Sequence, residues 1–195
     1  MLVSTIGQSK GCAPAIASEI FNALSSLPSE IEQILNLDSD IERISEQFVE
    51  KNNALFLGRG IHYPIALEGA LKLKEISYIH AEGYAAGELK HGPLALVDDS
   101  MPVVAVAPSD ELIGKLKSNL EEVRARGAQL LIFADESISL NEESALTVLK
   151  IPACSKLTSP ILYTIPIQLL AYHVAVFKGT DVDQPRNLAK SVTVE

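Results

Sequence analysis

The sequence predicts an α/β fold, a three-layer α/β/α sandwich on a five-stranded parallel sheet. From about residue 54 onward, short apolar runs alternate with longer stretches whose apolar residues recur at helical spacing. Strands separated by such helices pair in parallel. The composition agrees, because 47% of the 195 residues are hydrophobic and only 5% are aromatic. We divide the chain into a helical lead-in or linker, residues 1–45, and a sheet domain, residues 46–195.

The lead-in is expected to contain two helices. Residues 1–10 show little periodicity and are expected to fray. Apolar residues recur at helical spacing in residues 13–23 and again in residues 29–49, and Pro28 is expected to separate the two stretches. Both helices would need a partner surface, either the domain that follows or a part outside this chain.

The first strand is expected at residues 54–57, directly before a Gly-Arg-Gly turn (58–60). Pro64 marks the start of the next helix, because proline is favoured in a first helical turn. The turn begins like a dinucleotide-binding fingerprint, but Tyr63 occupies the third glycine position. The two glycines suit either a phosphate or sugar at a helix N-terminus or merely a tight turn. No cofactor is predicted from them.

The helix after this turn carries a narrow charged stripe. Glu68, Lys72 and Glu75 are spaced i, i+4 and i+7, so they share one face, whereas the other sides are mainly apolar. Such a stripe indicates charges directed into a cleft between packed layers, where chemistry can take place. The alternative is a salt bridge from Glu68 to Lys72, with Glu75 at a solvated edge.

The remaining elements continue the alternation. A strand is expected at residues 79–84, and then a helix at residues 86–97 that must accommodate Gly92 and Pro93. Three more strands are expected at residues 103–107, 129–134 and 146–151, and two more helices at residues 110–126 and 160–177.

The carboxyl edge of this sheet is the expected ligand-binding edge, because ligands of open parallel sheets bind beyond the carboxyl ends of the strands. Here that edge would hold the 58–60 turn, the segment after Tyr84, and Pro108. The loop after Ala134 would join them.

Charge and composition exclude several classes of protein. The net charge of -9 and the pI near 5.0 argue against a nucleic-acid surface. Residues 160–177 are apolar enough to suggest a membrane span, but Pro166 and His173 favour a buried helix. Cys12 and Cys154 have neither metal-ligand nor redox spacing, which favours free thiols in the cytoplasm. No signal peptide, membrane association or metal site is predicted.

His91 is a candidate proton shuttle. It lies between Lys90 and Gly92-Pro93, where the backbone must turn, so a core position is not expected. The alternative is an exposed loop histidine with no role.

The last fifteen residues, 181–195, contain too little apolar surface to form an element of their own. They either form a disordered tail or wrap over the domain and deliver Lys190 to a site. An amine held beside a carboxylate can attack a carbonyl to form a Schiff base, while the carboxylate moves a proton from the adjacent carbon. Lys190 and Glu75 would make such a pair.

Three segments carry a resemblance to a known family: LEGALKLKE (67–75), GELKHGP (87–93) and DQPRNLAKSVTVE (183–195). Together they resemble the glucosamine-6-phosphate synthases, the isomerising glutamine:fructose-6-phosphate aminotransferases. The resemblance covers about residues 29–195. It implies the Rossmann-like or flavodoxin-like SIS (sugar isomerase) fold, a phosphosugar substrate and a homodimer.

The resemblance also implies roles for single residues. Glu75 corresponds to the base that moves a proton between C1 and C2 of the sugar, and Lys190 to the lysine that forms a Schiff base with open-chain fructose 6-phosphate. His91 corresponds to the histidine that assists ring opening from the neighbouring subunit. Lys72 matches a polar substrate-binding residue, and Ala189 a backbone contact to the sugar.

The chain also departs from the family pattern. The Ser/Thr-rich phosphate loop of the first SIS domain has no counterpart here, and neither Cys12 nor Cys154 begins the chain as the glutaminase nucleophile does. We therefore expect a C-terminal isomerase-domain fragment or truncated relative, with the first SIS domain and the glutaminase domain as its partners. Alone, it should show little synthase activity. The alternatives are a non-catalytic SIS module for phosphosugar binding or dimerisation, and a remnant that binds nothing.

Overall fold

A five-stranded parallel sheet with the order β2-β1-β3-β4-β5 forms the centre of the molecule. The computed structural model describes residues 2–11, 13–140 and 146–186. The strands are β1 (Asn53–Gly58), β2 (His80–Ala85), β3 (Pro102–Ala107), β4 (Gln129–Asp135) and β5 (Leu146–Ile151). All neighbouring strands pair in parallel, so the five-stranded parallel sheet expected from the sequence is confirmed.

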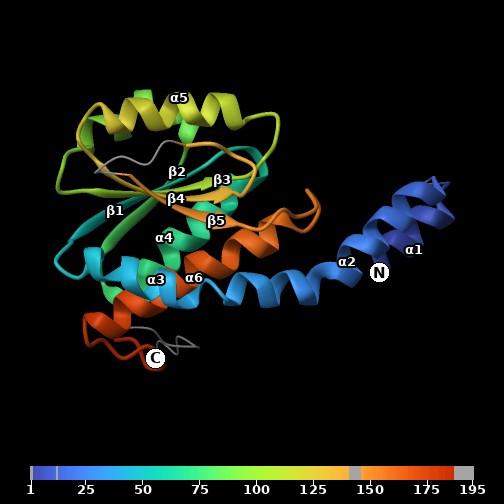
Figure 1. The fold of residues 1–195 in the computed structure, drawn as a ribbon, viewed down its shortest axis with the longest axis horizontal. Coiled ribbons are helices and arrows are strands. Elements are labelled where there is room, and N and C mark those ends of the chain that lie inside the picture. The colour runs from blue at the N-terminus through green and yellow to red at the C-terminus, as the bar shows by residue number, and fades with distance from the viewer. Residues whose placement is uncertain (1, 12, 141–145, 187–195) are drawn as a thin grey trace, which may run out of the picture.

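Helices cover both faces of the sheet (Figure 1). Side chains of a strand alternate between the faces, so in β1 Phe56 joins one buried apolar layer and Leu57 the other. One layer is closed by α3 (Asp38–Ser45), α4 (Tyr63–Ser77) and α6 (Ser159–Phe177). The other is closed by α5 (Ile113–Arg124) and the short 3-10 helices η3 (Ala86–His91) and η4 (Pro93–Leu96). The predicted three-layer sandwich is therefore confirmed.

The N-terminal segment differs from its prediction. Residues expected to fray form α1 (Leu2–Ser9), which folds back along the first half of α2 (Pro14–Leu35) (Figure 1). Pro28 does not separate two helices, because α2 continues through it and ends only at Leu35. Pro28 lacks an N–H, but Ser26 and Ser29 donate their hydroxyls to backbone carbonyls of this region. Such bonds help a helix to pass through a proline.

The end of this lead-in packs into the sheet domain. Ile34 of α2 and Ile41 and Ile44 of α3 belong to the apolar layer beneath the sheet. The short 3-10 helix η1 (Glu46–Phe48) follows and buries Phe48 in the same layer. A division of the chain between residues 45 and 46 stays a prediction.

Residues 86–97 also differ from the predicted single helix. They form η3 and η4, separated at Gly92, whose φ of 143° is unfavourable for residues with a side chain. Pro93 cannot donate an N–H, so a continuous helix would lose a hydrogen bond at this point. Two short helices avoid that loss.

α6 is a core helix, as expected. It is long and apolar enough to cross a membrane by composition, but ten of its residues are buried within the fold. α6 packs closely against α4. A Cβ added to Gly69 of α4 would lie 2.3 Å from the Ile167 side chain of α6 and 2.7 Å from the Phe56 ring of β1. α4 is thus held between the sheet and α6.

Candidate functional site

Lys72 and Glu75 form an ion pair on α4. Lys72 Nζ donates to Glu75 Oε2 at 2.7 Å, with about a third of the Lys72 side chain and a quarter of the Glu75 side chain exposed. This hydrogen bond raises the pKa of Lys72 above its ordinary value. The alternative salt bridge from Glu68 to Lys72 is wrong, because Glu68 Oε1 instead accepts a hydrogen bond from Gln168 Nε2 at 3.2 Å. Lys72 therefore holds the carboxylate of Glu75.

The ion pair lies toward the amino edge of the sheet. α4 begins at Tyr63, after the carboxyl end of β1, and returns the chain to the start of β2. Glu75 is twelve residues along this helix, a rise of roughly 18 Å. Glu75 thus lies at the opposite end of α4 from the 58–60 turn that was expected to mark the ligand-binding edge.

The segment after α6 returns to this same end of α4. Thr180 Oγ1 donates to the Ile76 carbonyl at 2.6 Å, and the backbone N–H of Arg186 donates to the Tyr78 hydroxyl at 2.9 Å. The Arg186 guanidinium lies over the Tyr78 ring, 4.1 Å from its centroid. Of the two predictions for the tail, the described part up to Arg186 follows the second and wraps onto the domain.

Lys190 and Ala189 lie outside the described residues, so their predicted roles stay predictions. Lys190 is four residues beyond Arg186, and four residues of extended chain span at most about 14 Å. Arg186 is attached to Tyr78, which follows Glu75 by three residues. The four residues of chain from Arg186 are thus long enough for a proposed approach of Lys190 to Glu75.

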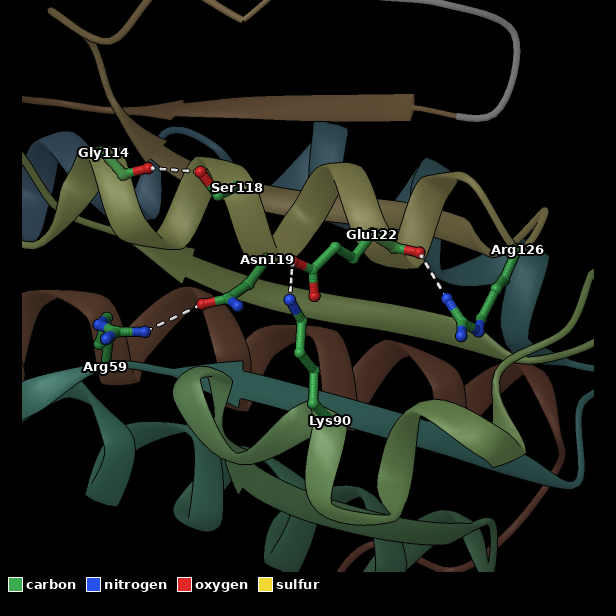
Figure 2. A network of polar contacts seen from close by, with 7 residues as sticks. All are labelled: Arg59, Lys90, Gly114, Ser118, Asn119, Glu122 and Arg126. Carbon is green, nitrogen blue, oxygen red and sulfur yellow. Dashed lines mark hydrogen bonds and ion pairs between the residues drawn. The ribbon is translucent and has the colours of Figure 1, made fainter.

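His91 is not brought to Glu75 within this chain. It lies exposed at the end of η3, on the α5 side of the sheet. As Figure 2 shows, Lys90 of η3 pairs with Glu122 of α5 (Nζ to Oε1, 2.8 Å), and Arg59 of the 58–60 turn donates from Nη1 to Asn119 Oδ1 of α5 at 2.9 Å. A role for His91 beside Glu75 would require a second copy of the chain.

A separate cavity of about 160 Å³ lies at the carboxyl edge of the sheet. Gly60, Pro108 and Asp135 line it, as expected of that edge, but neither the segment after Tyr84 nor the Lys72–Glu75 pair does. Within the described part of the chain, no three or more His, Cys, Asp or Glu side chains are grouped so that they could hold a metal ion.

His62 is a buried titratable residue in the lining of this cavity. Its Nε2 lies 3.1 Å from Ser159 Oγ, and its Nδ1 is buried without a hydrogen-bond partner. Burial lowers the pKa of His62, and the nearby Asp110 carboxylate opposes this in part. Burial of the ring thus disfavours the protonated form of His62 relative to an exposed histidine.

Sequence reasoning missed Thr180, Tyr78 and Arg186 as parts of this arrangement. Thr180 lies 104 residues from its partner Ile76, and Arg186 lies 108 residues from Tyr78. No spacing rule connects residues so far apart. The available signal was the composition of residues 181–195, which pointed to a wrapping tail but not to its attachment points.

The comparisons with known proteins agree with the fold and with the resemblance. A family profile described as "SIS domain" matches residues 47–178. The chain is 60% identical over all 195 residues to a protein named glutamine–fructose-6-phosphate aminotransferase [isomerizing] from Yersinia pseudotuberculosis, and 61% identical to its Escherichia coli K12 namesake. In each case it spans 32% of the relative's length.

Among solved structures, the chain is similar to the C-terminal domain of glucosamine-fructose-6-phosphate aminotransferase from Francisella tularensis. The TM-score is 0.90 and the identity 49%, over 94% of this chain and 52% of that one. The resemblance expected from the three sequence segments and the predicted fold class are both confirmed.

Proposed function

The chain belongs to the SIS domain family, and from this we propose that it supplies the second sugar isomerase domain of an isomerising glutamine–fructose-6-phosphate aminotransferase. In that role it acts in the cytoplasm with a first SIS domain and a glutaminase domain. Together these convert fructose 6-phosphate, with ammonia released from glutamine, to glucosamine 6-phosphate. The identity of 60% across the whole chain supports the proposal.

One observation carries the assignment of the site: the C-terminal segment returns to the end of α4 that bears the Lys72–Glu75 pair. This return supports the assignment, because the four residues from Arg186 to Lys190 are long enough to bring the amine to Glu75. An amine and a carboxylate on opposite sides of one open-chain ketose are what the isomerisation needs.

The chemistry follows from these groups. The Lys190 amine adds to the C2 carbonyl of open-chain fructose 6-phosphate and water leaves, giving a Schiff base. Ammonia then displaces the lysine from C2. Glu75 takes a proton from C1 of the resulting imine and returns a proton to C2, while the C1 hydroxyl proton is transferred to the nitrogen through an enolamine, so that C1 becomes the aldehyde and C2 carries the amine. Lys72 orients the Glu75 carboxylate, Ala189 offers its backbone to the sugar, and His91 assists ring opening from the neighbouring copy of a homodimer.

Borohydride trapping with fructose 6-phosphate tests this proposal. Reduction of the Schiff base leaves a sugar on the lysine, and mass spectrometry locates it. We expect the label at Lys190, its complete loss in Lys190→Ala, and no loss in Lys115→Ala, which removes an exposed lysine of α5. The experiment is run on this chain and on a full-length protein that ends in it. No Lys190 label in either would contradict the proposal.

A non-catalytic phosphosugar-binding or dimerisation module is the second candidate. The cavity at the carboxyl edge favours it, because ligands of doubly wound sheets bind there and Glu75 is not part of its lining. The same lysine variant separates the two candidates. Fructose 6-phosphate should bind a pure sensor equally well before and after Lys190→Ala, as measured by the shift in thermal unfolding.

A further inference from the structure

We propose that Tyr78 and Arg186 are positioning residues that set where the C-terminal segment leaves the domain and thereby align Lys190 with Glu75. This inference rests on the proposed function. We call the two residues the Tyr78–Arg186 clamp. Neither residue is assigned to the chemistry, and both act through the segment that follows Arg186.

Two contacts of different kinds form the clamp. The Tyr78 hydroxyl accepts the Arg186 backbone N–H at 2.9 Å, and the Tyr78 ring lies under the Arg186 guanidinium at 4.1 Å from its centroid. The hydrogen bond fixes the backbone of Arg186, and the cation–π contact fixes its side chain. One tyrosine therefore restrains both the position and the direction of the chain at this residue.

The backbone of Tyr78 is itself unusual. Its φ of 62° and ψ of 15° are left-handed, and among the described residues no other non-glycine residue has a positive φ. Glycine is the usual residue at such a helix end, and a bulky residue there is an outlier that points to a function. Here the conformation ends α4 three residues after Glu75 with a side chain that contacts the tail.

A hydrogen-bonded turn between α6 and Arg186 directs the chain toward Tyr78. Thr180 Oγ1 donates to the Ile76 carbonyl, and Asp181 Oδ1 accepts the backbone N–H groups of Asp183 and Gln184, both at 2.9 Å. The side chain of Asp181 thus holds a turn that leads from the end of α6 to Tyr78. The clamp is the last described attachment before Lys190.

The clamp matters because Lys190 is only four residues beyond it. A free tail would sample many positions, and only a small fraction would place the amine at the carbonyl beside Glu75. Loss of a hydrogen bond and a cation–π contact together shifts such an equilibrium by roughly tenfold. We therefore expect about that loss in the rate of Schiff-base formation, with little change in sugar affinity.

Hydrogen exchange of this chain tests the attachment without any substrate. Tyr78→Phe removes the hydroxyl acceptor and keeps the ring, whereas Arg186→Gln removes the guanidinium and keeps the backbone N–H. The backbone amide of Arg186, which donates to the Tyr78 hydroxyl, should exchange several-fold faster in each variant, and about tenfold faster in the double variant. Tyr172→Phe on α6 and Arg126→Gln beyond α5 are matched controls and should leave this exchange unchanged.

Borohydride trapping then tests the positioning, in whichever protein labels Lys190. The single-turnover rate of labelling should fall about tenfold in the double variant, the sugar concentration giving half-maximal rate should stay constant, and Arg186→Lys should recover part of the rate. Unchanged exchange in both single variants would overturn the clamp. Faster exchange with an unchanged labelling rate would overturn its positioning role. If no protein labels Lys190, the proposed function fails, and the positioning role that depends on it fails as well.

Discussion

His62 shows at the scale of one residue how burial shifts a pKa. Its ring is buried, packs edge-on against Tyr163 with ring centroids 5.4 Å apart, and approaches the Ser159 hydroxyl. Desolvation of the imidazolium lowers the pKa of His62 below its ordinary value of 6.5.

Stability should therefore depend on pH through His62. The unfolded chain binds a proton near pH 6.5, whereas the folded chain binds it only at lower pH. The stabilising contribution is thus present above pH 6.5 and is lost as the pH falls toward the folded pKa, by at most about 1.4 kcal/mol per pH unit. We expect the thermal unfolding midpoint to be roughly a few degrees lower at pH 5.5 than at pH 7.5.

Two histidine variants isolate this effect. His62→Gln should show a smaller fall of the midpoint between the two pH values, because no imidazole remains to be protonated. His91→Gln, which changes an exposed residue, should show the same fall as the unchanged chain. Equal falls in both variants would assign the pH dependence to other groups.

At the scale of the element, α4 depends on its contact with α6. Gly69 lies in this contact, where a Cβ would meet Ile167 of α6 and Phe56 of β1. Glu75 is six residues further along, so a displaced helix would also displace the Lys72–Glu75 pair. This contact explains why a glycine is retained inside a helix that it would otherwise weaken.

Gly69→Ala should lower the free energy of unfolding by about 1–3 kcal/mol, because overpacking outweighs the gain in helix propensity. Gly114→Ala in α5 is the matched control. No heavy atom lies within 4 Å of the Cβ it adds, so it should be neutral or stabilising by up to about 1 kcal/mol. Urea unfolding of both variants gives the comparison. Equal stability of the two would mean that α4 and α6 have room to separate.

At the scale of the whole molecule, the α1–α2 hairpin extends away from the sandwich (Figure 1). Leu2, Val3 and Phe21 are large apolar side chains that it leaves exposed. Along α2, contacts with the apolar layer beneath the sheet begin at Leu27, near the middle of the helix, and include Ile34 near its end. The part of the hairpin before Leu27 therefore adds exposed apolar surface without contributing to this layer.

Removal of residues 1–25 should change the thermal unfolding midpoint by no more than about 2 °C. The shortened α2 would begin with Ser26 as its cap and Pro28 in its first turn, which are favourable residues for a helix start. Self-association at high concentration, measured by light scattering, should decrease with the loss of the exposed apolar residues. A midpoint lowered by 10 °C or more would mean that the hairpin stabilises the sandwich.

The sequence by itself determined the layers of the fold. Buried positions recur at a spacing that depends on the element, and apolar residues occupy those positions. The five strands, α4 and α6 were therefore predicted close to their observed bounds. The errors arose where a local signal was overruled: Pro28 within α2, the frayed terminus that became α1, and the single helix that splits at Gly92. At Pro28 and at the N-terminus, neighbouring hydrogen bonds or packing outweighed the local preference, whereas at Gly92 the local preference of Gly92-Pro93 prevailed over the helical spacing.

Only the tertiary structure decided which side chains meet. It paired Lys72 with Glu75 rather than with Glu68, put Glu75 at the other end of α4 from the carboxyl edge, and attached Arg186 to Tyr78 across 108 residues of sequence. The roles of His91, Lys190 and Ala189 stay predictions. Residue periodicity records whether a side chain is buried, but the direction of a helix and the path of a returning tail follow from packing between distant segments.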